Sequence, residues 1–104
     1  MDEARFGRIN RPVRCWAPPG VRPLVGSQTV RESVYLYTAA CPTDGTADSL
    51  IMPTMHTQCF QHLVDYVAEQ HPDQLNLMVV DGAASHTSSG LKLPDNVRII
   101  TLPP

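Results

Sequence analysis

The chain has few of the features that mark several large classes of protein. Its 104 residues include three cysteines, Cys15, Cys41 and Cys59, and no Cys-x-x-Cys pair. This spacing argues against a disulfide framework and against a zinc site, and is typical of a reducing compartment. No signal peptide is recognisable and no apolar run approaches the roughly 18 residues of a membrane span. We therefore expect a cytoplasmic protein.

Several catalytic signatures are also missing. There is no Gly-x-Ser-x-Gly motif, and Gly82 stands alone rather than in a glycine-rich phosphate loop. Aromatic residues make up only 6% of the chain. We expect Trp16, Tyr35 and Tyr37 to be core or half-buried strand residues, because a base-stacking platform would need basic residues interleaved with them.

Charge is sparse, with 17% charged residues and a formal net charge of −2. A basic domain is the usual footprint of nucleic-acid binding, so this balance argues against a broad electrostatic interface. A metal-dependent nuclease core stays compatible with it, because divalent ions supply the local positive charge. The arginines concentrate in the first third and would either form a solvated face or contact phosphates: Arg5, Arg8, Arg11, Arg14, Arg22 and Arg31.

The length predicts one small domain spanning residues 1–104, and ten prolines punctuate it. Composition and turn signals predict strands at residues 4–9, 14–17, 33–40, 49–53, 75–80 and 97–102. We expect a hairpin connection at 10–12, a turn at 42–46, and an edge position for 49–53 because Pro53 ends it. The continuous apolar run at 75–80 predicts a strand covered on both faces.

Helical periodicity appears once. Apolar residues recur at i, i+1, i+4, i+5, i+8 and i+9 from Cys59, which predicts an amphipathic helix. Thr57 is the expected N-cap, and His71-Pro72 should end the helix. A short second helix is expected at 85–91. The order predicts an α/β fold in which early strands pair antiparallel through short turns and the last two run parallel, forming a mixed sheet with helices on its faces.

Asp81 is the strongest candidate for chemistry. It directly follows the apolar run Leu77-Met78-Val79-Val80, and ligands bind outside the carboxyl ends of strands in open α/β sheets. A turn aspartate supporting Gly82 is the structural alternative. A carboxylate that accepts a phosphoryl group would show the same sequence pattern, an acid directly after an apolar strand.

Asp2 and Glu3 form a second acidic candidate, although acids this near a chain start are usually solvated. A central strand could bring Asp2 beside Asp81, and carboxylate oxygens are what hard divalent ions select. Adjacent strand residues point to opposite faces, so Glu3 should not replace Asp2. His86 could orient Asp81, contact a phosphate or have no chemical role. His62 should be exposed on the polar side of the helix.

Four segments in order resemble the catalytic core of DDE/DDD transposases, in particular the bacterial insertion-sequence group related to the mariner elements. Asp2-Glu3-Ala4-Arg5-Phe6-Gly7 is similar to the first-acid motif, and Arg14-Cys15-Trp16-Ala17-Pro18-Pro19-Gly20 to a Trp-Ala-Pro-x-Gly hallmark. Met78 to His86 resembles the second-acid motif. Val97 to Pro104 resembles the strand ending in Leu-Pro-Pro that precedes the third acid.

The resemblance implies a ribonuclease H-like (retroviral integrase-like) fold with strand order 3-2-1-4-5. It implies metal-dependent DNA cleavage and strand transfer with Mg²⁺ or Mn²⁺, and DNA as partner. Asp2 and Asp81 would be the catalytic and metal-binding acids, and His86 and Glu3 would be accessory.

The departures from the family pattern shape the expectation. Gly82 replaces the usual Asn after the second acid, and no third acid follows Leu102-Pro103-Pro104 within the 104 residues. We therefore expect a truncated domain that binds metal weakly and is inactive alone. One alternative is a non-catalytic interaction module or relic that persists as a strand-paired homodimer. The other is a phosphohydrolase that uses Asp81 as nucleophile.

Overall fold

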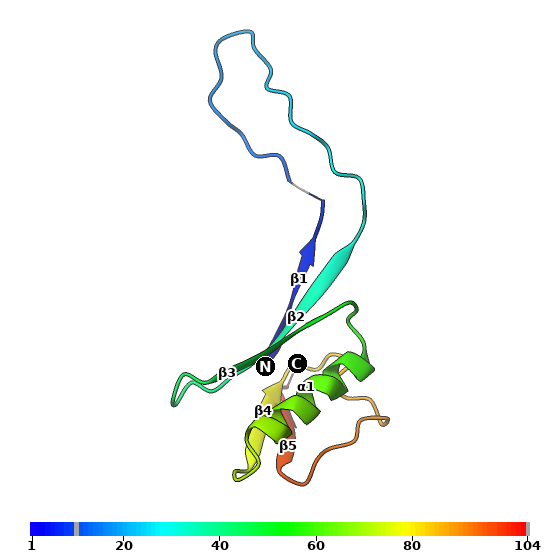
Figure 1. The fold of residues 1–104 in the computed structure, drawn as a ribbon. Helices are drawn as coiled ribbons and strands as arrows, with labels where there is room; N and C mark the ends of the chain where they lie inside the picture. The colour runs from blue at the N-terminus through cyan, green and yellow to red at the C-terminus, as the bar shows by residue number, and fades with distance from the viewer. Residues whose placement is uncertain (10, 104) are drawn as a thin grey trace.

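Two small sheets and one helix organise the protein, whose computed structural model describes residues 1–9 and 11–103. The elements are β1 (Asp2–Gly7), β2 (Ser33–Ala40), β3 (Ala47–Met52), α1 (Thr57–Gln70), β4 (Asn76–Val80) and β5 (Val97–Thr101). β1, β2 and β3 pair antiparallel in that order, whereas β4 and β5 pair in parallel (Figure 1). The expected mixed α/β architecture is confirmed at this level, as is the edge position of β3.

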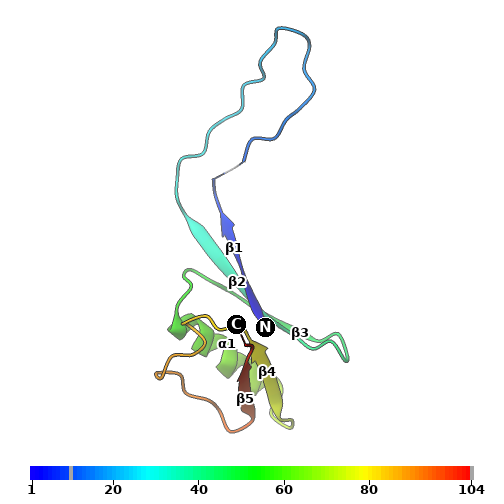
Figure 2. The ribbon, with the colours of Figure 1, turned by 180° about the vertical axis from the view of Figure 1, so that it is seen from behind.

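The two sheets meet where β1 begins and β4 ends. Met1 N donates to Val79 O at 3.0 Å, so the start of β1 lies beside the end of β4. Figure 2 shows β1 and β2 rising away from this junction while β4 and β5 lie on its other side. The junction therefore places the start of the chain beside the residues that follow β4.

The core lies between α1 and the inner faces of both sheets. Tyr37 of β2, Val80 of β4 and Val97 of β5 are fully buried against the helix. The helix contributes Cys59, Phe60, Leu63, Val64, Val67 and Ala68, which are the apolar positions that the periodicity predicts. Burial of each large apolar side chain stabilises the fold by roughly 1.5–3 kcal/mol. One helix face thus holds the two sheets together.

The ends of α1 correct one prediction and confirm another. Thr57 is not the N-cap. His56 has extended backbone angles, and its ring Nδ1 accepts a hydrogen bond from Gln58 N at 3.2 Å. The helix ends at Gln70, directly before His71 and Pro72, because a residue that precedes proline is disfavoured in helical conformation.

The predicted strand at residues 14–17 is wrong. The segment lies in a long excursion between β1 and β2, called here the arm (residues 11–32), which contains no strand or helix. Trp16 is fully exposed rather than buried. Prolines on both sides restrict the segment, and among the described residues no neighbouring strand offers it a hydrogen-bonding partner. Of the expected connection at 10–12, Asn10 lies outside the described residues, and the chain beyond it runs into the arm rather than into a second strand.

Two further expectations fail. The outward side chains of β4, Leu77 and Val79, are 59% and 42% exposed, so this strand is covered on one face only. Residues 85–91 form turns instead of a helix, since a short segment rich in Ser, Thr and Gly favours local side-chain hydrogen bonds. Predicted and observed bounds of the other strands differ by one or two residues at some ends.

Within the described ranges, no helix is long and apolar enough to cross a membrane.

Candidate functional site

Two rows of side chains cross the antiparallel sheet on opposite faces. Glu3 lies opposite Tyr37 on the face covered by α1. Asp2 lies opposite Thr38 on the outer face, where the Thr38 and Ser49 hydroxyls are 2.9 Å apart. Strand alternation requires this separation. As a result the Glu3 side chain is only 7% exposed, whereas Asp2 is exposed.

A tight turn organises the chain after β4. Asp81 Oδ1 accepts a hydrogen bond from Ala83 N at 3.0 Å, and Ala83 O accepts one from His86 N at 3.0 Å. The turn folds His86 back over the core, where its ring lies 4.5 Å from that of Phe60. His86 is 4% exposed and is the buried polar residue of this core.

His86 joins the two acidic candidates that flank the junction. Its Nδ1 lies 2.8 Å from Asp81 Oδ1, and its Nε2 lies 2.6 Å from Glu3 Oε1. One imidazole therefore spans from β1 to the residues after β4. Glu3 and His86 are 83 positions apart in the sequence but belong to a single hydrogen-bonded cluster.

The cluster has a specific proton requirement. A neutral imidazole donates from one nitrogen only, whereas both nitrogens here face carboxylate oxygens. Both ring nitrogens of an imidazole donate only in its protonated form. Such charge-assisted hydrogen bonds are about twice as strong as neutral ones, so the cluster is a firm link between the two sheets.

The pKa of Asp81 lies below its usual value of 3.8. The hydrogen bond from Ala83 N is the largest cause, partial burial opposes it, and the hydrogen bond and charge of His86 add to the lowering. The carboxylate is 65% exposed. Asp81 is therefore held ionised at the surface while one of its oxygens is fixed from behind.

Asp2 also keeps a free oxygen. Its Oδ1 accepts from Glu3 N at 2.9 Å, and in the described part of the chain neither its Oδ2 nor that of Asp81 has a hydrogen-bond partner. Asp2 follows the residue that contacts Val79, and Asp81 lies two residues beyond Val79. The structure shows no direct contact between these two acids. In residues 1–9 and 11–103, no three His, Cys, Asp or Glu side chains are grouped so that they could hold a metal ion.

Tyr37 of β2 lies opposite Glu3, beside the cluster. Its hydroxyl donates to Thr54 O at 3.3 Å and accepts from His56 N at 3.2 Å. Burial raises its pKa above 10.0, the His56 contact lowers it, and the charge of nearby Glu3 raises it further. Tyr37 was expected to be a core or half-buried strand residue, but no local pattern indicates its link to the helix start.

Glu3 and His86 were both expected to be accessory residues, but the sequence did not indicate that they pair. The available signal was strand alternation, which puts Glu3 on the same face as the buried residue Tyr37. Of the other histidines, His62 is exposed as expected. His71 Nε2 lies 2.8 Å from Asp48 Oδ2, a hydrogen-bonding contact that the sequence did not indicate.

Comparison with known proteins gives three matches. A family model described as DDE superfamily endonuclease matches residues 1–104. The uncharacterized protein y4pE/y4sA of Sinorhizobium fredii (strain NBRC 101917 / NGR234) is 31% identical over 71 residues, covering 67% of this chain and 53% of that protein. The solved structure titled Mos1 transposase paired-end complex with left transposon end superposes with a TM-score of 0.55 at 16% identity, covering 94% of this chain and 33% of that one.

The chain thus spans about half the length of the Sinorhizobium relative and a third of the solved chain. At 16% identity the structural match concerns the fold alone.

Proposed function

The chain belongs to the DDE superfamily endonuclease family, and we propose that it forms the part of a ribonuclease H-like nuclease domain that carries the first two metal-binding acids, Asp2 and Asp81. The antiparallel order β1-β2-β3, the parallel β4–β5 pair and the contact of Met1 with Val79 support the fold assignment. The match to the endonuclease family supports a nuclease activity, and the likeness in fold to a transposase supports the ribonuclease H-like assignment.

One observation carries the proposal. The buried His86 ring ties β1 to the turn after β4 through Glu3 and Asp81. A solvated acid near a chain start would need no such support, and a simple turn aspartate would need no buried imidazole. The cluster therefore gives β1 and Asp81 a fixed relation at the junction from which Asp2 and Asp81 both emerge.

The donor set suits a hard divalent cation. Asp2 and Asp81 are exposed carboxylates, each with an Oδ2 not used within the described protein, and Mg²⁺ and Mn²⁺ prefer such oxygens. DDE superfamily endonucleases generally use divalent metal ions, which supply positive charge and an activated water for phosphodiester cleavage. Asp2 and Asp81 would hold such an ion.

The other residues act as positioning groups. His86 occupies Asp81 Oδ1 and directs the free oxygen outward. Glu3 fixes the opposite side of the His86 ring, and Phe60 packs against its face. A carboxylate held in this way loses little rotamer entropy when it binds a ligand. Replacing either positioning group should weaken metal binding without removing a ligand.

We also propose that residues 1–104 by themselves bind metal weakly and do not cleave DNA. Many phosphoryl-transfer sites hold two divalent metal ions. The two carboxylates of Asp2 and Asp81 compensate poorly for the positive charge of two such ions. Duplex DNA is the proposed partner, and its phosphates would meet the exposed arginines of the arm, such as Arg14 and Arg22.

Metal binding is tested on the purified chain by Mn²⁺-induced broadening of assigned NMR signals. Broadening centred on Asp2 and Asp81 is expected, and the double variant Asp2→Asn/Asp81→Asn should abolish it. Asp95→Asn is the matched control, since this acid is exposed elsewhere. Broadening that is not centred on Asp2 and Asp81 would overturn the proposed metal site. Mg²⁺-dependent nicking of supercoiled plasmid that disappears in Asp81→Asn would overturn the proposed inactivity.

An interaction module is the second candidate. β3 is an open sheet edge whose outward Ile51 is 73% exposed, and exposed apolar edges favour pairing with another chain. Light scattering distinguishes the two cases, because a strand-paired homodimer has twice the 11.4 kDa mass of the monomer. A single species at the monomer mass at all concentrations would exclude this candidate.

A further inference from the structure

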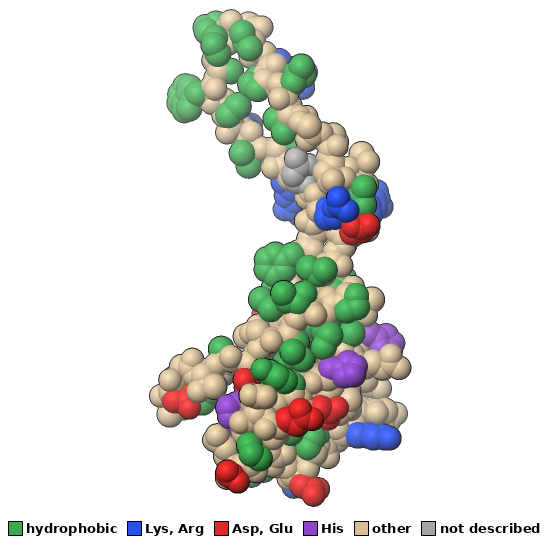
Figure 3. Space-filling model, viewed as in Figure 1, with side chains coloured by type: hydrophobic (Ala, Val, Ile, Leu, Met, Phe, Trp, Pro, Cys, Tyr) green, Lys and Arg blue, Asp and Glu red, His purple; other side chains and the backbone are tan. Residues whose placement is uncertain are grey.

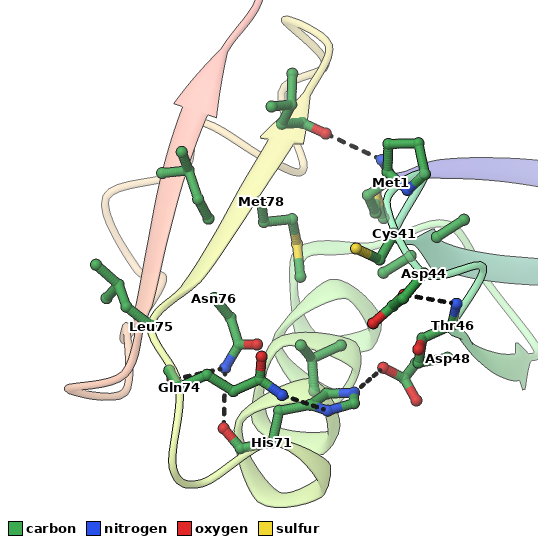
Figure 4. Close-up of a pocket in the computed structure, with 16 residues that line it drawn as sticks. Met1, Cys41, Asp44, Thr46, Asp48, His71, Gln74, Leu75, Asn76 and Met78 are labelled. Atoms are coloured by element: carbon green, nitrogen blue, oxygen red, sulfur yellow. Dashed lines mark hydrogen bonds and ion pairs between the residues drawn. The ribbon is translucent and has the colours of Figure 1, made fainter.

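Two hollows of the surface differ in the charge of their walls. The hollow beside the end of α1 contains Asp44 and Asp48 (Figure 4), and hydrogen bonds from Thr46 hold the pKa of Asp44 below 3.8. The other hollow has a volume of about 620 Å³, lies at the base of the arm and contains Arg5 and Arg31. It is called here the arginine hollow. An anion is repelled by the first hollow and attracted by the second.

The pairing of β1 with β2 brings the side chains of the arginine hollow to one face. Arg5 lies opposite Tyr35 in the ladder, and Gly7 lies opposite Ser33. Alternate residues of a strand share a face, so Ser33 and Tyr35 both lie on the side of Arg5. Arg31 comes two positions before Ser33 and also lines the hollow. Because Gly7 has no side chain, the face stays open between Arg5 and the arm.

Ser33 orients the guanidinium of Arg5. Arg5 Nε donates a hydrogen bond to Ser33 Oγ at 3.0 Å. Among the described residues, the two terminal nitrogens of Arg5 have no hydrogen-bond partner. A guanidinium presents its donors as a rigid, planar fork that matches the oxygens of a phosphate. Arg5 therefore offers donors whose orientation is fixed before a ligand arrives.

The positive charge of the hollow is not neutralised by the acids around it. Glu32 also lines the hollow, but its carboxylate accepts from Arg8 Nη1 at 2.6 Å. Glu3, two residues before the hollow on the same face of β1, contacts His86. Arg31 is exposed and, in the part of the chain that the structure describes, forms no hydrogen bond or ion pair through its side chain. Figure 3 shows basic side chains gathered near the base of the arm.

The opposite wall of the hollow is aromatic and apolar. Tyr35, Pro53 and Met55 line it, and Met55 is exposed. The Tyr35 hydroxyl has no hydrogen-bond partner within the described residues. A cationic wall that faces an apolar wall matches the nucleic-acid backbone, whose phosphate oxygens would contact the arginines while sugar carbons contact Tyr35 and Met55.

The exposed position of the hollow favours a phosphate that belongs to a polymer. Sites for a free phosphate commonly surround the anion with backbone N–H groups, whereas the donors here are side chains on an exposed ribbon. Arg5 follows Asp2 by three residues on β1, which is roughly 10 Å along the strand. This is less than the roughly 12 Å width of the major groove of B-DNA. A duplex that reaches Asp2 therefore also comes within reach of the hollow.

We propose that Arg5 and Arg31 together bind one phosphodiester group of the DNA backbone in the arginine hollow, with the Tyr35 hydroxyl as a further donor. The inference rests on the proposed DNA partner and adds to it a contact fixed on β1, the strand that carries Asp2. A phosphate contact carries no sequence information but sets the register and orientation of the duplex. Arg5 and Arg31 are thus positioning residues.

The first test is the salt dependence of binding to a short fluorescein-labelled DNA duplex, measured by anisotropy in EDTA. The variant Arg5→Gln/Arg31→Gln should bind about tenfold more weakly and should lower the slope of log affinity against log salt by about 0.9, the value of one phosphate. Each single variant should lower the slope much less, because the remaining arginine still neutralises the phosphate. Arg98→Gln/Lys92→Gln removes the same charge from exposed positions on the other lobe and is the matched control.

The second test observes the arginine side chains of the unaltered protein. In ¹⁵N NMR the Nε–H signals of Arg5 and Arg31 should shift when the duplex is added, while the signal of Arg98 should stay in place. Inorganic phosphate, the probe for a free anion, should shift them only at far higher concentrations than the duplex. This measurement needs no substitution, so it does not depend on whether a variant folds.

Loss of one phosphate from the salt slope in the double variant, together with duplex-induced shifts of both arginines, supports the proposal. A slope in the double variant equal to that of the control, full and additive losses in the two single variants, or shifts caused by inorganic phosphate but not by the duplex would each overturn it. A wild-type chain that binds no DNA would overturn the proposed DNA partner as well. Because EDTA removes divalent metal, none of these outcomes depends on metal binding by Asp2 and Asp81.

Discussion

At the scale of single residues, His86 determines how the acidic side chains are arranged. Both of its ring nitrogens face carboxylates, and its ring packs on Phe60 in the core. A buried polar group is stable only when its hydrogen bonds are satisfied. The His86 position therefore depends on Glu3 and Asp81 together, and each acid depends on His86 for its orientation.

His86→Ala should lower the free energy of unfolding by about 3 kcal/mol. The substitution leaves the nearly buried Glu3 without its partner and opens a cavity beside Phe60, and breaking a buried pair costs roughly this much. Urea denaturation measures the change. His62→Ala, at an exposed helix position, is the control and should stay within about 0.5 kcal/mol. In the double variant His86→Ala/Glu3→Leu the loss should be smaller than in His86→Ala, and an equal or larger loss would contradict the pairing.

Asp81 should make stability depend on pH in the acid range. Its pKa is lowered in the folded protein from 3.8, chiefly by Ala83 N and then by His86, so the unfolded state binds more protons as pH falls. Its contribution is fully present above the unfolded pKa and is lost as pH drops through the folded one. Unfolding measured between about pH 2 and about pH 6 should show a steeper acid loss in the wild type than in Asp81→Asn. Equal slopes would contradict the assignment.

At the scale of elements, α1 connects the parts. Its apolar face contacts β2 and β3 and buries the inner residues of β4 and β5, whereas its N-terminus is fixed by His56 and the Tyr37 hydroxyl. The helix start is thus tied to β2, the strand that pairs with β1 beside the acidic cluster.

The capping role of His56 is testable with a matched pair of substitutions. His56→Asp should raise the free energy of unfolding by about 0.5 kcal/mol, because aspartate is a better N-cap acceptor for Gln58 N. Thr57→Ala should change it by less than about 0.5 kcal/mol, since Thr57 is the first helical residue and not the cap. A loss of about 1 kcal/mol in Thr57→Ala would instead identify Thr57 as the cap.

At the scale of the whole molecule, the protein is more extended and exposes more surface than a compact domain of its length. The Cα radius of gyration is 19.1 Å, compared with about 13 Å for a compact domain of this length. The accessible surface is 8126 Å², compared with about 5,800 Å² expected for its mass. Figure 3 shows the extended arm with apolar side chains along it and basic side chains near its base, while acidic ones gather on the opposite lobe.

The extended arm should increase the radius of gyration of the protein in solution. Small-angle scattering of the monomer should give a radius of gyration well above about 13 Å, and shortening the arm by deleting residues 12–30 should reduce it. Trp16, the only tryptophan, should be quenched by iodide as efficiently as a free indole. Protection of Trp16 that grows with protein concentration would show that the arm is covered by a second copy.

The arginines of the arm should contribute to DNA binding in proportion to the phosphates they contact. Replacing Arg14 and Arg22 together by alanine should weaken binding to duplex DNA and reduce the slope of log affinity against log salt by up to about 2. Fluorescence anisotropy over a series of salt concentrations measures both quantities. Lys92→Ala, on the other lobe, is the control. An unchanged slope in the double arginine variant would assign DNA contacts elsewhere.

The sequence by itself determined the elements that local patterning specifies. The helix, the strand at Ser33–Ala40 and the apolar run before Asp81 have strong periodicity or β propensity, and each was predicted close to its observed bounds. Four ordered motifs also carried the family resemblance. These features depend on neighbouring residues only, so no knowledge of the fold was needed to find them.

The tertiary structure alone decided which of these residues meet. The residues at 14–17 have a strand-like composition but no neighbouring strand in the part of the chain that the structure describes, so they stay in the arm. The pairing of Glu3 with His86 requires contact across 83 positions, and no local pattern encodes such a contact. Long-range contacts arise when α1 brings the two sheets together, and that packing is what places Glu3, His86 and Asp81 in one cluster.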